Sequence, residues 1–449
     1  MAKHRPRRDP GTPLSLPPSV ATLLGDESDA LLAALARESP VSIRLNPLKP
    51  SSIAGERVPW CVSGLYLPER PSFTLDPLLH AGAYYVQEAS SMLLEQAFRR
   101  TDLAEKDILA LDLCAAPGGK STHLASLLTP GSLLVSNEVT PARQNALMEN
   151  LWKHGGANTV ITGSAPTAFA ALGNTFDLVL VDAPCSGEGM FRKDPFARQQ
   201  WNERLVSTCA RTQGEILQDA WSAVGTGGWL IYSTCTWERT ENEEQVLALV
   251  RQGAEFTSIP MPQEWGVHRS DAGYRCYPHR VKGEGFFLAL LHKPGARRTR
   301  SMDEPRPHLP EEIAAWLREP ALSTFCEKDG TMYALPVRWG TAVDGLSSHL
   351  RVKSPGIPIG ERRGEHWRPH AALALNELLD QGAFPTMDLD RDQALTYLRG
   401  ETALSGRSNV PGASGVQLVR YAGLPLGWLH AAGDRWNNGW PKPWRIRMR

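Results

Sequence analysis

Short apolar runs and longer amphipathic stretches alternate through the middle of the 449-residue chain. This pattern predicts strands at residues 107–113, 132–137, 158–162, 176–182, 228–234 and 285–291, and helices from residue 120 and at 142–154, 203–223 and 241–252. Strands that alternate with helices form a mostly parallel sheet with helices on both faces. Ligands of such sheets bind at the carboxyl ends of the strands, so the residues that follow each strand are the candidates for a site.

The pattern differs on the N-terminal side of this central region. Residues 1–13 are basic and rich in Pro, which predicts a disordered tail. Residues 14–75 combine leucines at helical spacing with an alternating run at 41–47, and they predict a small α/β cap with Arg44 and Asn46 on its polar face. The central domain is then assigned to residues 76–293.

The pattern of apolar and polar residues differs again in the C-terminal third, after a stretch rich in Pro, Arg and Gly at 294–308. Residues 309–385 predict an α+β domain of ferredoxin-like type, with helices at 310–318 and 371–379 and a strand at 331–337. Residues 386–449 consist of short strands separated by Gly, Pro and Asn, which predicts a compact β-rich module.

Net charge identifies no partner, because 48 Lys and Arg residues balance 48 Asp and Glu residues. The seven cysteines are odd in number and form no C-x-x-C pair, which argues against a disulfide framework and against a zinc site, so we expect no metal. No apolar run approaches the ~18 residues that span a bilayer, and no signal peptide is recognisable. We therefore expect a soluble cytoplasmic monomer with no membrane partner.

The loop after the first central strand, residues 114–121, is built from small residues that allow a ligand close to the backbone. A phosphate-binding loop of the type GxxxxGK[ST] would require glycine at Cys114, and a dinucleotide motif GxGxxG is absent. The loop therefore suits a ligand without phosphates. Glu138 follows the second strand, where a carboxylate can accept hydrogen bonds from both ribose hydroxyls. This combination suits S-adenosylmethionine.

Two cysteines follow two further strands of the same predicted sheet. Cys185 lies in Asp182-Ala-Pro-Cys-Ser-Gly187, and Cys235 follows strand 228–234. A free cysteine is usually a small buried apolar residue, but both of these follow polar turn residues. A thiolate that adds to carbon 6 of cytosine makes carbon 5 nucleophilic, so a methyltransferase with two thiols can divide the work between a nucleophile and a resolving base. Asp182 is placed to activate the ring.

These motifs resemble those of the Sun family of RNA cytosine-5 methyltransferases. The resemblance rests on Asp112-Leu-Cys-Ala-Ala-Pro-Gly-Gly-Lys120, on the two cysteine motifs, on residues 87–92 and on Arg44-Leu-Asn46, and it covers about residues 14–293. It implies a Rossmann-like S-adenosylmethionine-dependent methyltransferase domain with a mostly parallel seven-stranded sheet. Residues 386–449 are similar to the PUA-like RNA-binding module of the RsmF-like bacterial branch, which modifies 16S ribosomal RNA in the small ribosomal subunit.

The resemblance also implies roles for single residues. Cys235 would be the nucleophile and Cys185 would aid release, while Asp182 and Lys120 would hold the target cytosine. The methyl-donor site would comprise Cys114, Ala115, Ala116, Pro117, Gly118, Gly119, Lys120, Glu138, Ser164 and Asp182. One position departs from the family pattern: Ser164 stands near where the family usually has an acidic residue beside the adenine, and its hydroxyl or a water would replace that contact.

Two alternatives remain open on the sequence. An RNA-binding or ribosome-assembly factor could keep this fold without turnover, and a nucleotide-dependent oxidoreductase would share the alternation of strands and helices. The two failed phosphate motifs disfavour the oxidoreductase. Four C-terminal tryptophans, Trp428, Trp436, Trp440 and Trp444, suit either stacking on bases or packing in the core of a small β module.

Overall fold

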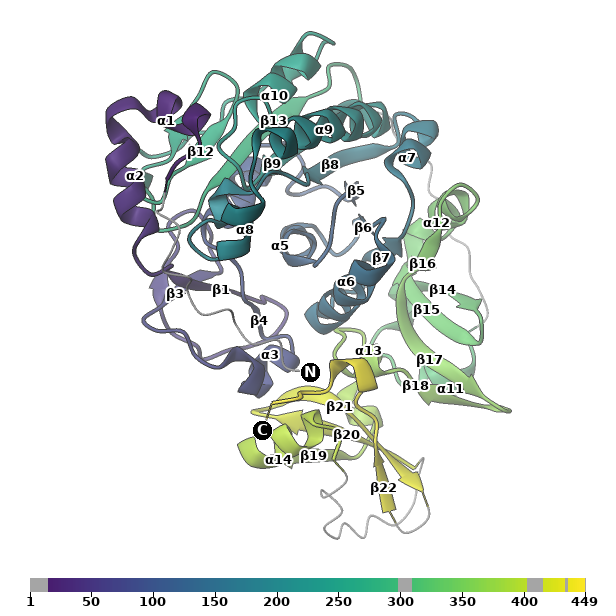
Figure 1. Cartoon of the computed structure of the whole chain (residues 1–449). Helices are drawn as coiled ribbons and strands as arrows, with labels where there is room; N and C mark the ends of the chain where they lie inside the picture. The colour runs from purple at the N-terminus through teal and green to yellow at the C-terminus, as the bar shows by residue number, and fades with distance from the viewer. Residues whose placement is uncertain (1–14, 298–308, 402–414, 433–434, 449) are drawn as a thin grey trace.

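A ten-stranded mixed sheet forms the centre of the protein (Figure 1). The computed structural model describes residues 15–297, 309–401, 415–432 and 435–448, and the predicted tail at 1–13 lies outside them. Five strands run parallel, in the spatial order β7 (Thr159–Thr162), β6 (Leu133–Asn137), β5 (Leu109–Asp112), β8 (Phe176–Asp182) and β9 (Val224–Thr234). The chain reverses its direction of winding between β5 and β8, which is where such sheets bind ligands.

Antiparallel strands extend the parallel core on both sides. Next to β9 lie β13 (Phe286–His292), β12 (Tyr274–Cys276) and β11 (His268–Arg269), and β10 (Glu255–Phe256) also pairs with β13. On the other side β16 (Val352–Ser354) pairs with β7. The Rossmann-like sheet expected from the sequence is confirmed. It has ten strands and not the expected seven. The strands β10, β11, β12 and β16 are too short for their sequence pattern to predict them.

Helices cover both faces of this sheet because successive strand residues point to opposite sides. Leu109 and Leu111 of β5 pack with α7 (Pro166–Leu172), α9 (Glu203–Ala223), α10 (Glu243–Val250) and α12 (Gly340–Ser347). Ala110, between them, packs with α4 (Leu94–Arg99) and α5 (Gly119–Leu127) on the other face. In Figure 1, α5 is seen end-on beside α6 (Pro141–His154).

The long helices begin and end where the sequence predicts them. Asn202 caps α9, because its side chain accepts a hydrogen bond from the Leu205 N–H at 2.9 Å. Helix α6 starts at Pro141 and stops at Gly155, whose φ of 85° favours glycine. The sequence analysis missed α7 between β7 and β8, because its seven residues are too few for a periodic signal.

The N-terminal cap contains α1 (Pro18–Leu24), α2 (Ser28–Leu35) and a four-stranded sheet, ordered β2 (Glu56–Arg57), β3 (Gly64–Leu67), β1 (Val41–Leu45) and β4 (Tyr84–Tyr85). Helix α3 (Pro77–His80) precedes β4, so this sheet continues past the boundary expected at residue 75. Arg44 and Asn46, expected on the polar face of the cap, are buried, with 1% and 4% exposure. Both point into the contact between the cap and the helices of the central domain, where their side chains donate hydrogen bonds to α5 and to the end of α6.

Residues 309–385 contain a four-stranded antiparallel sheet, ordered β14 (Ser323–Lys328), β15 (Thr331–Pro336), β17 (Ile357–Arg363) and β18 (His366–Pro369). Consecutive strands are neighbours here, whereas a ferredoxin-like domain would need helical crossovers between them, so the order differs from the expected one. The predicted helices shorten to α11 (Glu311–Ala314) and α13 (Ala371–Ala374). Helix α12 packs against the central sheet, and β16 pairs with strand β7 of that sheet.

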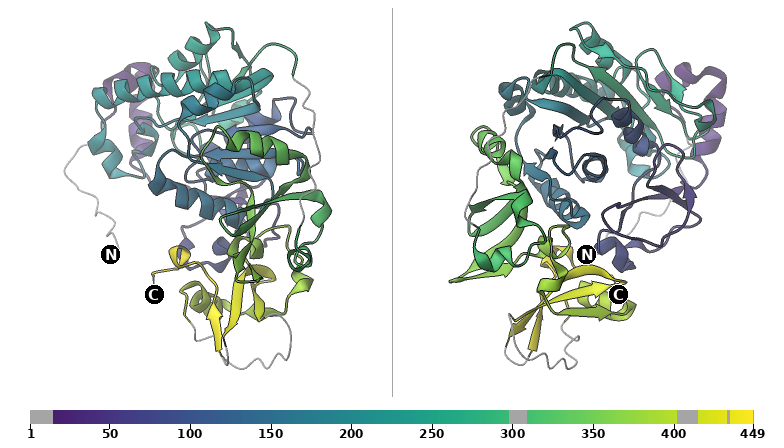
Figure 2. Two further views of the ribbon diagram at one scale, coloured as in Figure 1. Left: turned by 90° about the vertical axis from the view of Figure 1, so that its right-hand side faces the viewer. Right: turned by 180° about the vertical axis from the view of Figure 1, so that it is seen from behind.

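The last module contains β19 (Thr386–Leu389), α14 (Arg391–Leu398), β20 (Val416–Tyr421), β21 (Leu424–Ala432) and β22 (Arg435–Asn438). It lies against the cap and α13 (Figure 2), and its core is continuous with that of the cap. Trp428, Trp440 and Trp444 are 1%, 2% and 8% exposed, so these three are core residues. None of the helices in the described residues is long and apolar enough to cross a membrane.

Candidate active site

The two cysteines predicted at neighbouring strand ends are in contact. The Sγ atoms of Cys185 and Cys235 lie 2.9 Å apart, and the Cys235 N–H donates to Cys185 Sγ at 3.3 Å. Strands β8 and β9 are parallel with Asp182 opposite Ser233, so the chain leaves both strands at the same edge. Both thiols are free and half-buried.

Asp182 and Lys120 form an ion pair beside these thiols. Lys120 Nζ lies 2.7 Å from Asp182 Oδ2, and the Ser233 hydroxyl donates to Asp182 Oδ1 at 2.8 Å. Burial lowers the pKa of Lys120, but the charge of Asp182 and the hydrogen bond to it raise this pKa above its usual value overall. Lys120 is therefore a cation held next to the sulfur atoms. Nothing local in the sequence distinguishes Ser233, because its contact with Asp182 depends on strand register.

The pKa of the Cys185 thiol is held well above its usual range by the hydrogen bond with Cys235 and by burial. A thiol with a raised pKa stays protonated at neutral pH, and its thiolate is a strong base. Cys114, in the loop before α5, has its pKa raised by burial as well, and its sulfur packs against the core of the sheet.

The loop between β5 and α5 places small residues at the carboxyl end of the sheet. Ala115 and Ala116 are buried, Pro117 is exposed and Gly118 has a φ of 114°, a conformation that favours glycine. The first intrahelical bond of α5 joins the Thr122 N–H to Gly118 O, so the N–H groups of residues 119–121 are free to bind a ligand. Beneath them the Ser121 hydroxyl donates to the buried Asp112 at 2.6 Å.

Glu138 lies at the end of β6, as the sequence predicts, and is 4% exposed. Its Oε1 accepts the Thr140 N–H at 2.8 Å, and its Oε2 lies 3.2 Å from Arg143 Nη1. Arg143 also donates to the Ala116 carbonyl, so the Arg143 side chain connects the loop between β5 and α5 to the Glu138 carboxylate. The sequence analysis did not single out Arg143, since nothing in a helical stretch marks which arginine faces a site.

Ser164 makes a contact that the sequence does not predict. Its hydroxyl accepts the N–H of Arg351 at 2.7 Å, next to β16, and its backbone N–H donates to Asn137 at 2.9 Å. With 3% exposure, the side chain anchors the segment that adds β16 to the sheet. The serine at this position is explained by that contact between distant parts of the chain.

A buried polar network lies behind the two cysteines. Ser186 donates to Glu241, while the Thr236 hydroxyl and the Trp237 N–H donate to Glu188, the latter at 3.1 Å. Burial raises the pKa of Glu188 to about 7 and also raises the pKa of Glu241. Because Ser186 and Thr236 directly follow the two cysteines, this network holds both cysteine-containing loops. Sequence reasoning missed it, as buried carboxylates look like surface ones in a sequence.

One group of potential metal ligands occurs in the described residues, away from the cysteine pair. Cys61, Glu95 and His123 are buried together, with 3.8 Å between Cys61 Sγ and His123 Nε2 and 3.4 Å between His123 Nε2 and Glu95 Oε2. Arg99 pairs with Glu95 at 2.9 Å. These contacts account for a polar cluster that joins the cap to α4 and α5.

Comparison with known proteins agrees with this geometry. Residues 101–292 match the family model of 16S rRNA methyltransferase RsmB/F, residues 16–89 match the N-terminal domain of 16S rRNA methyltransferase RsmF, and residues 384–446 match the RsmF PUA domain. Ribosomal RNA small subunit methyltransferase F of Shewanella loihica is 30% identical over 92% of this chain and 91% of its own. The same protein of Escherichia coli O157:H7 is 31% identical over 92% of each chain.

Among solved structures, a methyltransferase homolog protein from Pyrococcus horikoshii is 26% identical, with a TM-score of 0.51 over 62% of this chain and all of its own. NSun6 from the same organism, solved with SFG, shares the fold at 21% identity and a TM-score of 0.52. Fold and site thus define a Rossmann-like methyltransferase that uses S-adenosylmethionine. The chain belongs to the ribosomal RNA small subunit methyltransferase F family.

The residues of the loop fit this methyl donor. The free N–H groups at the start of α5 suit the carboxylate of its methionine part, and Glu138 stands where the ribose hydroxyls of such ligands are bound. Each oxygen of the Glu138 carboxylate has one described partner and can accept a further hydrogen bond.

Proposed function

We propose that this protein methylates carbon 5 of cytosine in RNA of the small ribosomal subunit, through a covalent bond between Cys235 and carbon 6. The observation that carries the proposal is the contact of two free thiols, 2.9 Å apart, beside the Lys120–Asp182 ion pair. Methylation of an exocyclic amine or a ribose hydroxyl needs neither thiol. The matching family model is named for 16S rRNA and the relatives for small-subunit ribosomal RNA, and these names supply the class of substrate.

Cys235 acts as the nucleophile. Its thiolate forms a bond to carbon 6, and the electron pair of the carbon 5–carbon 6 double bond moves to make carbon 5 nucleophilic. Bound S-adenosylmethionine supplies the methyl group from its sulfonium centre.

Cys185 acts in the second half of the reaction. The proton on carbon 5 must be removed and the bond between sulfur and carbon 6 must break, which restores the double bond and the Cys235 thiolate. Cys185 first releases its own proton to water. The resulting thiolate, a strong base because of its raised pKa, takes the proton from carbon 5 beside the sulfur that leaves. Asp182, fixed by Ser233 and Lys120, holds the N3 and amine edge of the ring.

The target base must leave its stack to meet both sulfur atoms, so the substrate is an unpaired stretch of RNA or a helix that the protein opens. We assign RNA binding in part to the PUA-like module, residues 384–446. We further propose that the protein acts in the cytoplasm as a monomer and without a metal. The free state of all seven cysteines supports a reducing compartment.

Transfer of radiolabelled methyl groups from S-adenosylmethionine to small-subunit ribosomal RNA tests the proposal, with large-subunit RNA as the control. We expect label in the small-subunit RNA alone, and 5-methylcytosine at the labelled position by bisulfite sequencing. Label on an amine or a ribose would overturn the chemistry. Binding of S-adenosylhomocysteine and RNA without any transfer would favour the non-catalytic assembly factor.

A further inference from the structure

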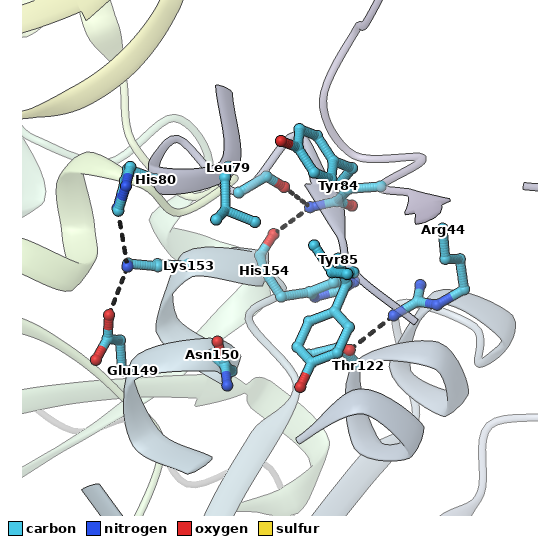
Figure 3. Close-up of a pocket in the computed structure, with 13 residues that line it drawn as sticks. Arg44, Leu79, His80, Tyr84, Tyr85, Thr122, Glu149, Asn150, Lys153 and His154 are labelled. Atoms are coloured by element: carbon cyan, nitrogen blue, oxygen red, sulfur yellow. Dashed lines mark hydrogen bonds and ion pairs between the residues drawn. The ribbon is translucent and has the colours of Figure 1, made fainter. Parts of the chain in front are cut away.

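A cavity of about 290 Å³ lies between the N-terminal cap and helices α5 and α6, and it contains none of the four catalytic residues (Figure 3). The cap contributes β1, α3 and β4 to its walls, and the central domain contributes Thr122 and one face of α6 from Glu149 to His154. In Figure 3, Arg44 and Thr122 stand on one side of the cavity, His80 and Lys153 on the other, and Tyr85 between them.

The cavity shares a wall with the catalytic loop. A Cβ atom on Gly119 would lie 3.1 Å from Cε1 of Tyr85, so the ring packs against the residue that precedes Lys120. The side chain of Asn150, which lines the cavity, donates to the Pro117 carbonyl at 2.8 Å. A ligand in this cavity is therefore a direct neighbour of the residues that hold the methyl donor and the target base.

Positive charge exceeds negative charge around the cavity. Arg44 is 1% exposed and its described hydrogen bonds go to neutral groups, Gln87 at 2.8 Å and Thr122 at 2.7 Å among them. Behind the wall the Lys49 ammonium donates to two backbone carbonyls, and Lys153 pairs with Glu149 at 2.5 Å. Arg44 and Lys153 thus line the cavity with a single carboxylate, and Lys49 lies behind them.

Arg44 keeps its charge at neutral pH, whereas Lys49 is only partly protonated. Burial and the neighbouring Lys153 lower the pKa of Lys49 to about 7, and burial lowers the pKa of Arg44 to about 10. His80 and His154 are neutral at physiological pH, since burial lowers their pKa values to about 4 and about 3. An anion in the cavity would offset the cost of burying these cations.

The remaining wall of the cavity is largely apolar and aromatic. Leu79, Tyr84, Tyr85 and Val86 line it, and the Tyr85 ring is half-buried, so part of the ring is accessible. A flat aromatic side chain next to cationic groups matches the two parts of a nucleotide, because bases stack on aromatic rings and phosphates pair with cations.

We propose that this cavity binds one nucleotide of the RNA strand beside the target cytosine, with its base on Tyr85 and its phosphate at Lys153. The proposal rests on the proposed function, which makes RNA the substrate, and it adds a specific subsite. The nucleotide enters between the cap and the central domain, and the base next to it reaches Lys120 and Asp182.

The two members of the Lys153–Glu149 ion pair provide a matched test. Lys153→Gln removes a cation and should weaken binding of an unpaired RNA fragment about fivefold, with a salt dependence reduced by about one counterion. Glu149→Gln removes the carboxylate and should strengthen binding about twofold. Both variants break the same ion pair, so a purely structural role would weaken binding in both, and that result would overturn the proposal.

Neutral methylphosphonate linkages, placed one at a time in the RNA, locate the phosphate. We expect one linkage next to the target cytosine to reduce wild-type affinity and to have no added effect in Lys153→Gln. An equal loss in both proteins at every position would overturn the subsite. Inorganic phosphate is the second probe: stabilisation of wild type by millimolar phosphate without any methylphosphonate effect would identify a site for free anions instead.

Tyr85→Ala keeps the test independent of the ion pair, because Lys153 also contacts the rings of Trp440 and Trp444. This variant should weaken binding of normal RNA but not of RNA that lacks the base beside the target, and equal losses for both RNAs would contradict base stacking on Tyr85.

Methyl transfer at saturating RNA separates failure of the nucleotide subsite from failure of the proposed function. If wild type transfers methyl groups normally and these variants bind RNA as wild type does, only the subsite fails; if wild type transfers none, the proposed function fails.

Discussion

The Sγ atoms of Cys185 and Cys235 lie 2.9 Å apart, although 50 positions separate the two residues in the chain. The parallel pairing of β8 and β9 brings them together, and the Gly189 N–H donates to the Cys235 carbonyl at 2.9 Å behind them. A Cβ at Gly189 would lie 2.7 Å from this carbonyl oxygen, so only glycine allows the two loops to approach so closely. Two thiols can therefore act in turn on adjacent carbon atoms of one base.

Substitution of each cysteine should have a different consequence. Cys235→Ala removes the nucleophile, and we expect a loss of methyl transfer of at least about a thousandfold. Cys185→Ala leaves the nucleophile but impairs release, so a covalent complex of protein and RNA should accumulate on denaturing gels. If the covalent complex appears with Cys235→Ala instead, the two roles are reversed. Cys209→Ala, on the outer helix α9, is the matched control and should retain activity.

Gly118→Ala should impair binding of the methyl donor. The φ of 114° at this residue strains any other side chain, at a cost of about 1–3 kcal/mol, and the added Cβ would lie 3.2 Å from Asn150. We expect a lower melting temperature together with weaker binding of S-adenosylhomocysteine by calorimetry. Gly253→Ala is the control, since Gly253 has a φ of 95° but lies outside the loop. That variant should lose stability and keep its affinity, and an equal loss of affinity in both would contradict the assignment of the loop.

Asp112→Asn should flatten the dependence of stability on pH. Burial, and then the charge of Asp182, raise the pKa of Asp112 from 3.8 to about 7, against the effect of the Ser121 hydrogen bond. The folded state therefore favours the protonated acid. This stabilisation is fully present below about pH 3.8 and is lost as the pH rises through about 7.

Urea unfolding at pH 4.5, 6 and 8 measures this effect. The free energy of unfolding of wild type should fall relative to that of Asp112→Asn as the pH rises across this range. Glu69→Gln, at an exposed position, should follow wild type. A constant difference between wild type and Asp112→Asn at all three pH values would show that the Asp112 carboxyl does not titrate there.

Ser164→Ala should affect stability and leave cofactor binding unchanged. The Ser164 hydroxyl accepts the N–H of Arg351, and without it that N–H loses its acceptor, at a cost of about 1–3 kcal/mol. We expect a lower unfolding midpoint with unchanged affinity for S-adenosylhomocysteine. A loss of affinity with unchanged stability would instead support the contact with adenine that the sequence suggested.

The sequence determined those features that depend on neighbours along the chain. The periodic pattern predicted α9, β8 and the end of α6, because caps and apolar spacing are local properties. It also identified both cysteines, Glu138 and the glycine loop, because each follows directly on a predicted strand. The shared edge of a parallel sheet was sufficient to place these residues in one site.

Only the tertiary structure decided which distant residues meet. Arg44 is buried where the cap meets the central domain, Ser164 accepts the N–H of Arg351 before β16, and Lys120 pairs with Asp182. In each case the partners are far apart in the sequence. The cavity beside Tyr85 likewise exists only where the cap meets α6. Short strands and single polar side chains carry little local signal, since their free energy comes from burial and hydrogen bonds that form when the modules pack together.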